Sequence, residues 1–175
     1  MGISTGGPAT LKELFTGMPR LNASILLVQH MPAFINEKVR FNLNKLTELD
    51  VVILKGLAKL ENGVMYVAPS GVHMVVKNNQ FIQLLEGPKK NFVCPSVDTT
   101  MLSVAENPAQ EIIAVVMTGM GKDGAEGLAH IKNIGGKTIA QDEASSIIYG
   151  MPKHAAATNC VDLIAPPQAI KKGAY

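Results

Sequence analysis

The chain has 175 residues, enough for one domain with a sizeable core and short for two. Hydrophobic residues make up 47% and charged residues 17%, without an acidic or basic block, so a folded protein is expected rather than a disordered one. The net charge of +2 is small, and the few aromatic residues are not interleaved with Lys and Arg, which argues against nucleic-acid binding.

Cysteine usage and hydropathy indicate the compartment. Cys94 and Cys160 lie far apart and show no CxxC or Cys/His metal spacing, so we expect reduced thiols and no metal site. The N-terminus has no charged segment followed by an apolar core, and no apolar run approaches the roughly 20 residues that span a bilayer. We therefore expect a soluble cytoplasmic protein.

Apolar runs alternate with amphipathic segments along the chain. Runs without in/out alternation, typical of strands buried on both faces of a parallel sheet, lie at 24–28, 51–54, 112–117 and 161–165. Helical spacing occurs at Leu11, Leu14, Phe15 and Met18, and again at Val39, Leu43 and Leu46. The pattern predicts a single α/β domain over 1–175, a doubly wound, mostly parallel sheet flanked by helices.

The segment 64–85 departs from this pattern. Runs at 64–68, 72–77 and 80–85 are separated by short turns, and Asn78-Asn79 fits a tight hairpin because Asn tolerates positive φ. We predict a local antiparallel unit made of these three runs. A helix is expected after Pro95, with Ser96 as its cap and Asp98 near the positive end of its dipole.

The start of the chain is unusual. A strand needs about five residues, yet only three precede Ser4. The sequence therefore predicts either a very short first strand or a chain cut from a longer one.

Three turns follow apolar runs, at the positions where a doubly wound sheet gathers its functional groups. The turn at 4–8 (STGGP) fits a connector or an anion cradle, and a nucleophile is the less common alternative. It lacks the spacing of a dinucleotide site or a P-loop and keeps only the first half of a GxSxG elbow.

His30, after the run 24–28, fits either a structural histidine or a general base. The remaining histidines, His73, His130 and His154, are less well placed, although His154 stays open. Asp123 lies in a glycine-rich turn at 118–124 and fits either a helix cap or the acid that orients an imidazole.

Ser4, His30 and Asp123 together form a catalytic-triad hypothesis, because each follows a candidate strand of one sheet. Competing acids are Asp98, Asp142 and Glu143. Neither a close carboxylate pair nor a metal-ligand cluster is visible in the spacing.

Seven motifs in collinear order resemble the catalytic domain of the chemotaxis protein-glutamate methylesterase (CheB) family. They are GISTGGP, VQHMP, YVAPSGVH, PSVD, MTGMGKDGAEG, QDEAS and YGMPKHA, and the similarity runs from residue 2 to about 165. The resemblance implies a modified doubly wound fold with an antiparallel hairpin, in agreement with the reading from the residues.

The resemblance also implies a function. Ser4 matches the nucleophile, His30 the base and Asp123 its orienting acid, while Thr5 and the backbone N–H of Met120 match groups beside the reacting carbonyl. The implied enzyme is a serine hydrolase that demethylates glutamyl methyl esters on cytoplasmic helices of bacterial membrane chemoreceptors, and in many members also deamidates glutamines. No cofactor, nucleic acid or membrane insertion is implied.

Two features differ from the family pattern. A receiver domain and linker usually precede this domain and do not occur in the sequence, and Phe92-Val93-Cys94 stands where a polar, basic segment is typical. Two alternative functions stay open from the residues, a phosphate or nucleotide-binding module and a catalytically idle domain that docks on receptors.

Overall fold

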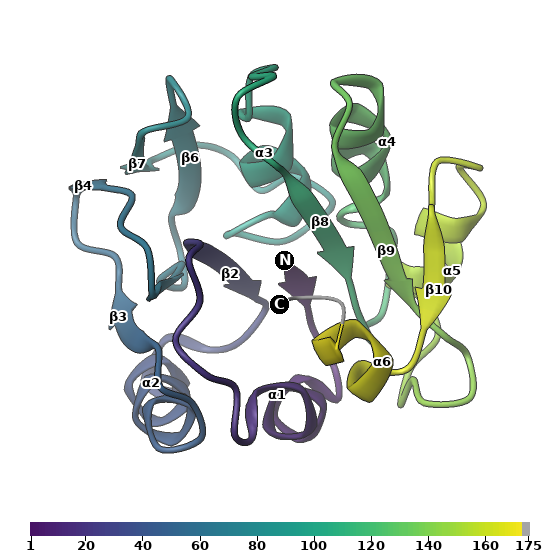
Figure 1. Cartoon of the computed structure of the whole chain (residues 1–175), viewed down its shortest axis with the longest axis horizontal. Coiled ribbons are helices and arrows are strands. Elements are labelled where there is room, and N and C mark those ends of the chain that lie inside the picture. The colour runs from purple at the N-terminus through teal and green to yellow at the C-terminus, as the bar shows by residue number, and fades with distance from the viewer. Residues whose placement is uncertain (173–175) are drawn as a thin grey trace.

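The computed structural model describes residues 1–172 and has a seven-stranded parallel sheet at its centre. The strand order is β10-β9-β8-β1-β2-β5-β3, and every neighbouring pair is parallel. The strands are β1 (Gly2–Ile3), β2 (Ile25–Gln29), β3 (Asp50–Ile53), β5 (Val64–Val67), β8 (Ile113–Val116), β9 (Lys137–Gln141) and β10 (Leu163–Ala165). The predicted doubly wound, mostly parallel sheet is confirmed (Figure 1).

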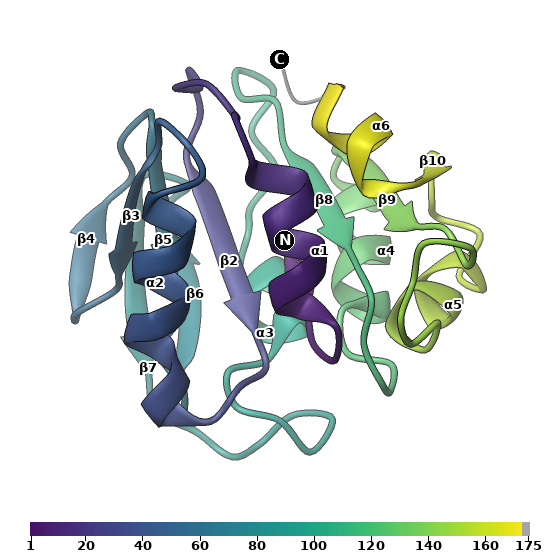
Figure 2. The same ribbon diagram turned by 90° about the horizontal axis from the view of Figure 1, so that it is seen from below.

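Helices cover both faces of this sheet. One face carries α1 (Gly7–Phe15), α2 (Asn36–Asn44), which follows the short 3₁₀ turn η1 (Ala33–Ile35), and α6 (Pro167–Lys172). The other face carries α3 (Val97–Leu102), α4 (Ala125–Asn133) and α5 (Met151–Ala156). Figures 1 and 2 show the sheet between these two layers. Each layer has its own buried apolar cluster, one around Phe15 and Met117 and the other around Val97 and Leu128.

A second, small sheet is antiparallel and has the order β4-β7-β6, with β4 at Leu57–Lys59, β6 at His73–Lys77 and β7 at Phe81–Leu85. The tight hairpin at Asn78-Asn79 is confirmed, since both residues have a φ of 50°. The prediction that 64–68 belongs to this unit is wrong. β5 lies between β2 and β3 in the parallel sheet, and all four of its residues are buried. A short apolar run fits both environments, so its pattern could not distinguish them.

Two strands have no counterpart in the sequence analysis, β4 and β9. β9 reads KTIAQ, in which polar residues interrupt the apolar pattern. Thr138 and Gln141 are nevertheless fully buried, because their side chains are satisfied by hydrogen bonds to Cys160, Thr118 and Ser145. Apolar periodicity does not detect a strand whose buried positions are polar.

The strand order explains where functional groups gather. From β1 the chain moves outward through β2 to β3 and β5, then returns to the other side of β1 to form β8 to β10. The carboxyl ends of β2, β1 and β8 therefore meet at the point where the winding reverses, which is the usual ligand position in such sheets. β1 has only two residues, so the very short first strand is what the structure has.

The amino ends of the strands border a cavity of about 850 Å³ lined in part by Met1, Leu26 and Ala114. None of the residues predicted to act in catalysis lines it. Within residues 1–172, no helix is long and apolar enough to cross a membrane.

Candidate active site

The structure brings the three predicted turns to one edge of the sheet. Ser4 follows β1, His30 follows β2, and Asp123 lies in the loop between β8 and α4. The backbone N–H of His30 donates to the carbonyl of Ile3 at 3.0 Å, and the N–H of Ser4 donates to the carbonyl of Thr118 at 2.9 Å. These bonds continue the ladder past the strand ends and fix Ser4 between its two neighbours.

Gly119 permits this close approach. A Cβ at this position would lie 2.6 Å from the Ser4 Cβ and 2.4 Å from the Met151 Sδ, closer than real side chains come. The Gly119 backbone is itself held, because its N–H donates to Ile148 and its carbonyl accepts from Met151. The loop after β8 is thus packed directly against the serine turn.

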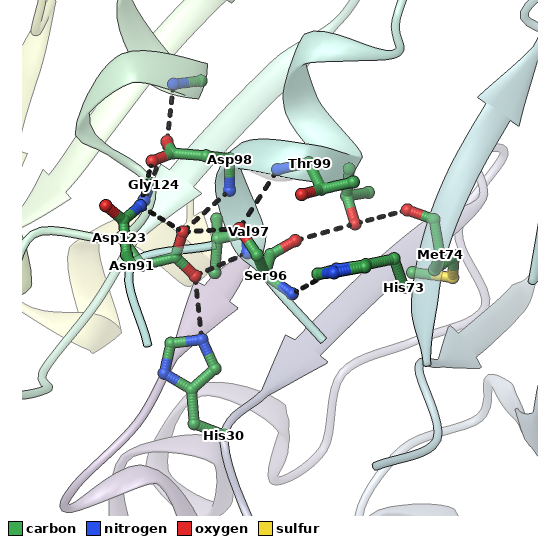
Figure 3. A network of polar contacts seen from close by, with 12 residues as sticks. His30, His73, Met74, Asn91, Ser96, Val97, Asp98, Thr99, Asp123 and Gly124 are labelled. Atoms are coloured by element: carbon green, nitrogen blue, oxygen red, sulfur yellow. Dashed lines mark hydrogen bonds and ion pairs between the residues drawn. The ribbon is translucent and has the colours of Figure 1, made fainter. Parts of the chain in front are cut away.

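His30 and Asp123 form a hydrogen-bonded pair (Figure 3). The His30 Nε2 lies 2.9 Å from the Asp123 Oδ2, and both side chains are largely buried. An ionised carboxylate only accepts hydrogen bonds, so Nε2 carries the proton and donates it. In the neutral ring Nδ1 is then unprotonated. Figure 3 shows Nδ1 on the side of the ring away from Asp123.

Asp123 accepts hydrogen bonds from several groups besides His30. Its Oδ2 accepts from the Val97 N–H at 2.6 Å, and its Oδ1 accepts from the Ser96 hydroxyl at 2.7 Å and the Asp98 N–H at 3.1 Å. Burial by itself raises the pKa of Asp123. The hydrogen bonds from His30, Ser96 and the start of α3 outweigh burial and lower the pKa to about 2. Asp123 is therefore an anion at neutral pH, in position to orient His30.

Ser4 lies beside this pair without being bonded to it. Over residues 1–172, no hydrogen bond joins the Ser4 hydroxyl to His30, although their strands are paired at Ile3 and Gln29. The hydroxyl turns on a single Cα–Cβ bond, and catalytic hydrogen bonds often form only when substrate binds. The structure thus joins two of the three predicted residues and places the third next to them.

Thr5 follows Ser4 in the chain, and Met120 follows Gly119, which packs against Ser4. The Thr5 carbonyl accepts a hydrogen bond from the buried Thr118 hydroxyl at 2.9 Å, while its side chain is exposed. The Met120 side chain is 79% exposed. In the described part of the chain, the backbone N–H groups of both residues have no hydrogen-bond acceptor, so they are free to bind an oxyanion.

The other histidines have structural partners. The buried His73 accepts from the Ser96 N–H at Nδ1 and donates from Nε2 to the Pro88 carbonyl. His130 bonds the Val104 carbonyl, and His154 bonds the Gly150 carbonyl of its own helix. None of the three is bonded to Asp123.

Of the competing acids, Asp142 bonds the nearby Ser145, and Glu143 is exposed. Asp98 differs from both. It is buried next to Asp123, and its carboxylate accepts from the N–H groups of Gly124 and Gly127 at the start of α4. Its predicted place in the first turn of α3 is confirmed, and so is the Ser96 cap, which accepts from the Thr99 N–H.

Two groups that support the site were missed. Asn91 donates from its amide to Asp123 and to Asp98, and nothing in the sequence marked it. The Gln141 Oε1 accepts from the buried Thr118 N–H at 2.8 Å and so supports the loop that leads to Gly119. Its place in the QDEAS motif was the available signal, but the motif alone does not say what the glutamine binds.

No cluster of three or more metal-binding side chains occurs in residues 1–172. Cys94 and Cys160 are both free and half-buried.

A doubly wound sheet with a serine, a histidine and an aspartate at its switch point is typical of hydrolytic enzymes that act without a metal. The comparisons with known proteins narrow this class. A model described as CheB methylesterase matches residues 1–173, and the chain belongs to that family.

Relatives agree with this assignment. The chain is 43% identical over 171 residues to a protein of Pyrococcus abyssi and 38% identical over 178 residues to one of Haloarcula marismortui, both named protein-glutamate methylesterase/protein-glutamine glutaminase. These matches cover 95% and 99% of this chain but 46% and 48% of the relatives, so the chain spans about half of their length.

A solved structure gives the same result. The crystal structure of the Thermotoga maritima CheB methylesterase catalytic domain aligns with a TM-score of 0.92 and 34% identity. The alignment covers 98% of this chain and 93% of that one. The fold predicted from the family resemblance is thereby confirmed.

Proposed function

We propose that this chain is a serine hydrolase that demethylates glutamyl methyl esters on the cytoplasmic helices of chemoreceptors, and that it also deamidates glutamines there. The observation that carries the proposal is the buried hydrogen bond between His30 and Asp123 at the strand ends next to Ser4. Membership of the CheB methylesterase family and the names of the relatives support the substrate class.

In the proposed mechanism, His30 removes the proton of the Ser4 hydroxyl, and Oγ attacks the γ-carbonyl carbon of the methylated glutamate. The protonated His30 then gives this proton to the departing methoxy oxygen, so methanol leaves and an acyl-enzyme remains. Water attacks the acyl carbon, His30 again takes a proton, and the Ser4 hydroxyl is restored as glutamate is released.

The proton transfers are assigned to Nδ1 of His30. Nε2 donates to Asp123, so the only lone pair of the neutral ring is on Nδ1. Asp123 holds this tautomer and stabilises the imidazolium that forms. The free backbone N–H groups of Thr5 and Met120 are proposed to stabilise the negative oxygen of the tetrahedral intermediate.

The experiment measures methanol release from methylated cytoplasmic fragments of chemoreceptors. It compares the unaltered chain with Ser4→Ala and His30→Ala, and circular dichroism checks that all three proteins are equally folded. Either substitution is expected to reduce kcat by several orders of magnitude, because the serine is a weak nucleophile without its base. A chelator is expected to leave the rate unchanged, since the proposed groups need no metal or cofactor.

Near-normal turnover in either variant would show that the proposed triad is wrong. No release from any of the proteins, combined with receptor binding that Ser4→Ala leaves unchanged, would favour an idle docking domain instead. Thermal stabilisation by nucleotides without esterase activity would favour a phosphate-binding module at the turn 4–8.

A further inference from the structure

Residues 90–93 form a two-residue hairpin turn at the edge of the candidate site. Lys90 and Val93 exchange both backbone hydrogen bonds at 3.1 Å, and the two central residues, Asn91 and Phe92, have φ values of 53° and 66°. Asparagine tolerates this left-handed conformation, whereas an aromatic residue adopts it rarely. The Phe92 side chain is 95% exposed, while the Asn91 side chain turns inward toward Asp123 (Figure 3).

The Asn91 amide lies between two buried carboxylates. Its Nδ2 is 2.7 Å from the Asp98 Oδ2 and 3.1 Å from the Asp123 Oδ1. The amide nitrogen carries two hydrogens, so it can donate one to each carboxylate. Asn91 is thus the side chain that joins the two acids.

Asp98 is a buried acid with no part in the proposed mechanism. Burial raises the pKa of Asp98, and the charge of Asp123 raises it further, while hydrogen bonds from Gly127 and Asn91 oppose both effects. Its other oxygen is held by α4, which approaches closely because residue 127 is glycine. A Cβ there would lie 2.6 Å from the Met101 Cβ. Hydrogen bonds from Gly124 and Gly127 thus hold Asp98 next to Asp123.

We propose that Asn91 is a positioning residue: its amide holds the Asp123 carboxylate in the orientation that receives the His30 Nε2–H and shields it from the neighbouring Asp98. The inference rests on the proposed function, because it assigns Asp123 as the acid that orients the base. Asn91 itself is placed next to Asp123 and outside hydrogen-bond contact with His30.

The charged and titratable groups near Asn91 come from several elements. Asp98 lies in α3, Asp123 lies before α4, and His30 follows β2. The ammonium of the neighbouring Lys90 pairs with the Glu126 carboxylate on α4 at 2.8 Å. A substitution that adds a third carboxylate at position 91 would therefore meet two acids on its inner side.

The test compares Asn91→Gly, Asn91→Asp and Phe92→Gly in the whole chain. Glycine adopts the left-handed turn freely, so Asn91→Gly removes the amide without straining the backbone. Phe92→Gly is the matched control, since it changes the same turn and leaves the amide. Thermal unfolding reports whether each variant is folded, and kcat and KM for methanol release are measured from pH 4 to 8, a range that approaches the ordinary pKa of an aspartate.

We expect kcat of Asn91→Gly to fall about tenfold or more at unchanged KM, with Phe92→Gly near the wild type, because a hydrogen bond to a charged group is lost. At pH 8, Asn91→Asp should have a still lower kcat than Asn91→Gly. The ratio of its kcat to that of the wild type should rise as the pH falls, because the added carboxyl becomes protonated. Equal kcat in Asn91→Gly and Phe92→Gly would overturn the proposal. So would a ratio of Asn91→Asp to wild type that does not change with pH.

A second readout does not depend on activity. In NMR spectra, the His30 Nε2 proton is assigned as the resonance that is missing from His30→Gln. This resonance should shift or vanish in Asn91→Gly and should persist in Phe92→Gly. If the wild type releases no methanol, the proposed function fails, and this resonance alone decides the positioning role. A resonance unchanged in Asn91→Gly would overturn that role.

Discussion

At the scale of single residues, Asp123 links the stability of the domain to its proposed chemistry. Its pKa is about 2 in the folded protein against 3.8 for an ordinary aspartate, so its ionised form favours folding. This contribution is present above about pH 4 and is lost as the pH falls through about 2, and two pKa units correspond to roughly 2 to 3 kcal/mol.

Asp123→Asn tests both consequences. We expect the variant to be less stable than the wild type at pH 7, and the difference in unfolding free energy to shrink between pH 4 and 2. Urea unfolding of both proteins at each pH measures this difference in free energy. Catalysis should fall by about four orders of magnitude, because the wrong tautomer of His30 is favoured. An unchanged rate would show that Asp123 does not orient His30.

Gly119 is the residue whose lack of a side chain lets the serine turn approach the loop after β8. In Gly119→Ala the new methyl group would overlap the Ser4 Cβ and the Met151 Sδ, and Ser4 must move to relieve it. We expect kcat for methanol release to fall at least tenfold, since small displacements of a nucleophile are costly. Gly87→Ala, whose added Cβ would meet only one atom at 3.7 Å, is the control and should keep its activity. Equal activity in the two variants would contradict the expected displacement of Ser4.

At the scale of elements, β9 shows how a strand with polar residues becomes part of the core. The Thr138 hydroxyl lies 2.5 Å from the Cys160 carbonyl and accepts from the Asp162 N–H at 3.1 Å, and so connects β9 to the segment that leads into β10. Thr138→Val keeps the shape but leaves the Cys160 carbonyl without this donor, which should cost about 1 to 3 kcal/mol in unfolding free energy.

Thr16→Val is the control for Thr138→Val, because the exposed Thr16 hydroxyl also donates to a carbonyl, that of Lys12, and water can replace it. The control should change stability by no more than about 0.5 kcal/mol. Chemical denaturation of both variants measures the two effects. Similar losses would mean that the buried hydroxyl has no special role.

At the scale of the whole molecule, the small antiparallel sheet shares its core with the large one. Met74, Val76 and Ile82 of the small sheet belong to the same buried cluster as Val116 of β8 and Leu128 of α4. Tyr66 of β5 adds a polar link, since its hydroxyl donates to the Lys59 carbonyl of β4 at 2.8 Å. We expect the two sheets to unfold together, in one transition.

The chain has no tryptophan, so a single introduced one reports on its own surroundings. Phe81→Trp places it on β7 of the small sheet, and Phe41→Trp places it on α2 next to the large sheet, both at exposed positions. Fluorescence from each variant and far-UV circular dichroism should give coincident urea transitions. An earlier transition for Phe81→Trp alone would show that the small sheet unfolds separately.

Most of the fold could be predicted from the sequence because its strands are buried on both faces and consist of uninterrupted apolar runs. The runs at 112–117 and 161–165 each contain a strand of the parallel sheet, and the runs at 24–28 and 51–54 each overlap one that is displaced by a single residue. The same property explains the error at 64–68, since an apolar run does not reveal which sheet it joins. The apolar pattern did not predict β9, because its buried Thr138 and Gln141 are polar and form hydrogen bonds with partners distant in sequence.

For the site, the sequence determined which chemical groups stand at the strand ends, namely Ser4, His30 and Asp123, because local turn residues and apolar runs locate those ends. The tertiary structure decided which of them meet and through which atoms. It joined His30 Nε2 to Asp123, gave Nδ1 no hydrogen-bond partner among residues 1–172, and surrounded Asp123 with donors from the start of α3 and from Asn91. These contacts join residues as far apart as 93 positions, so no local pattern encodes them.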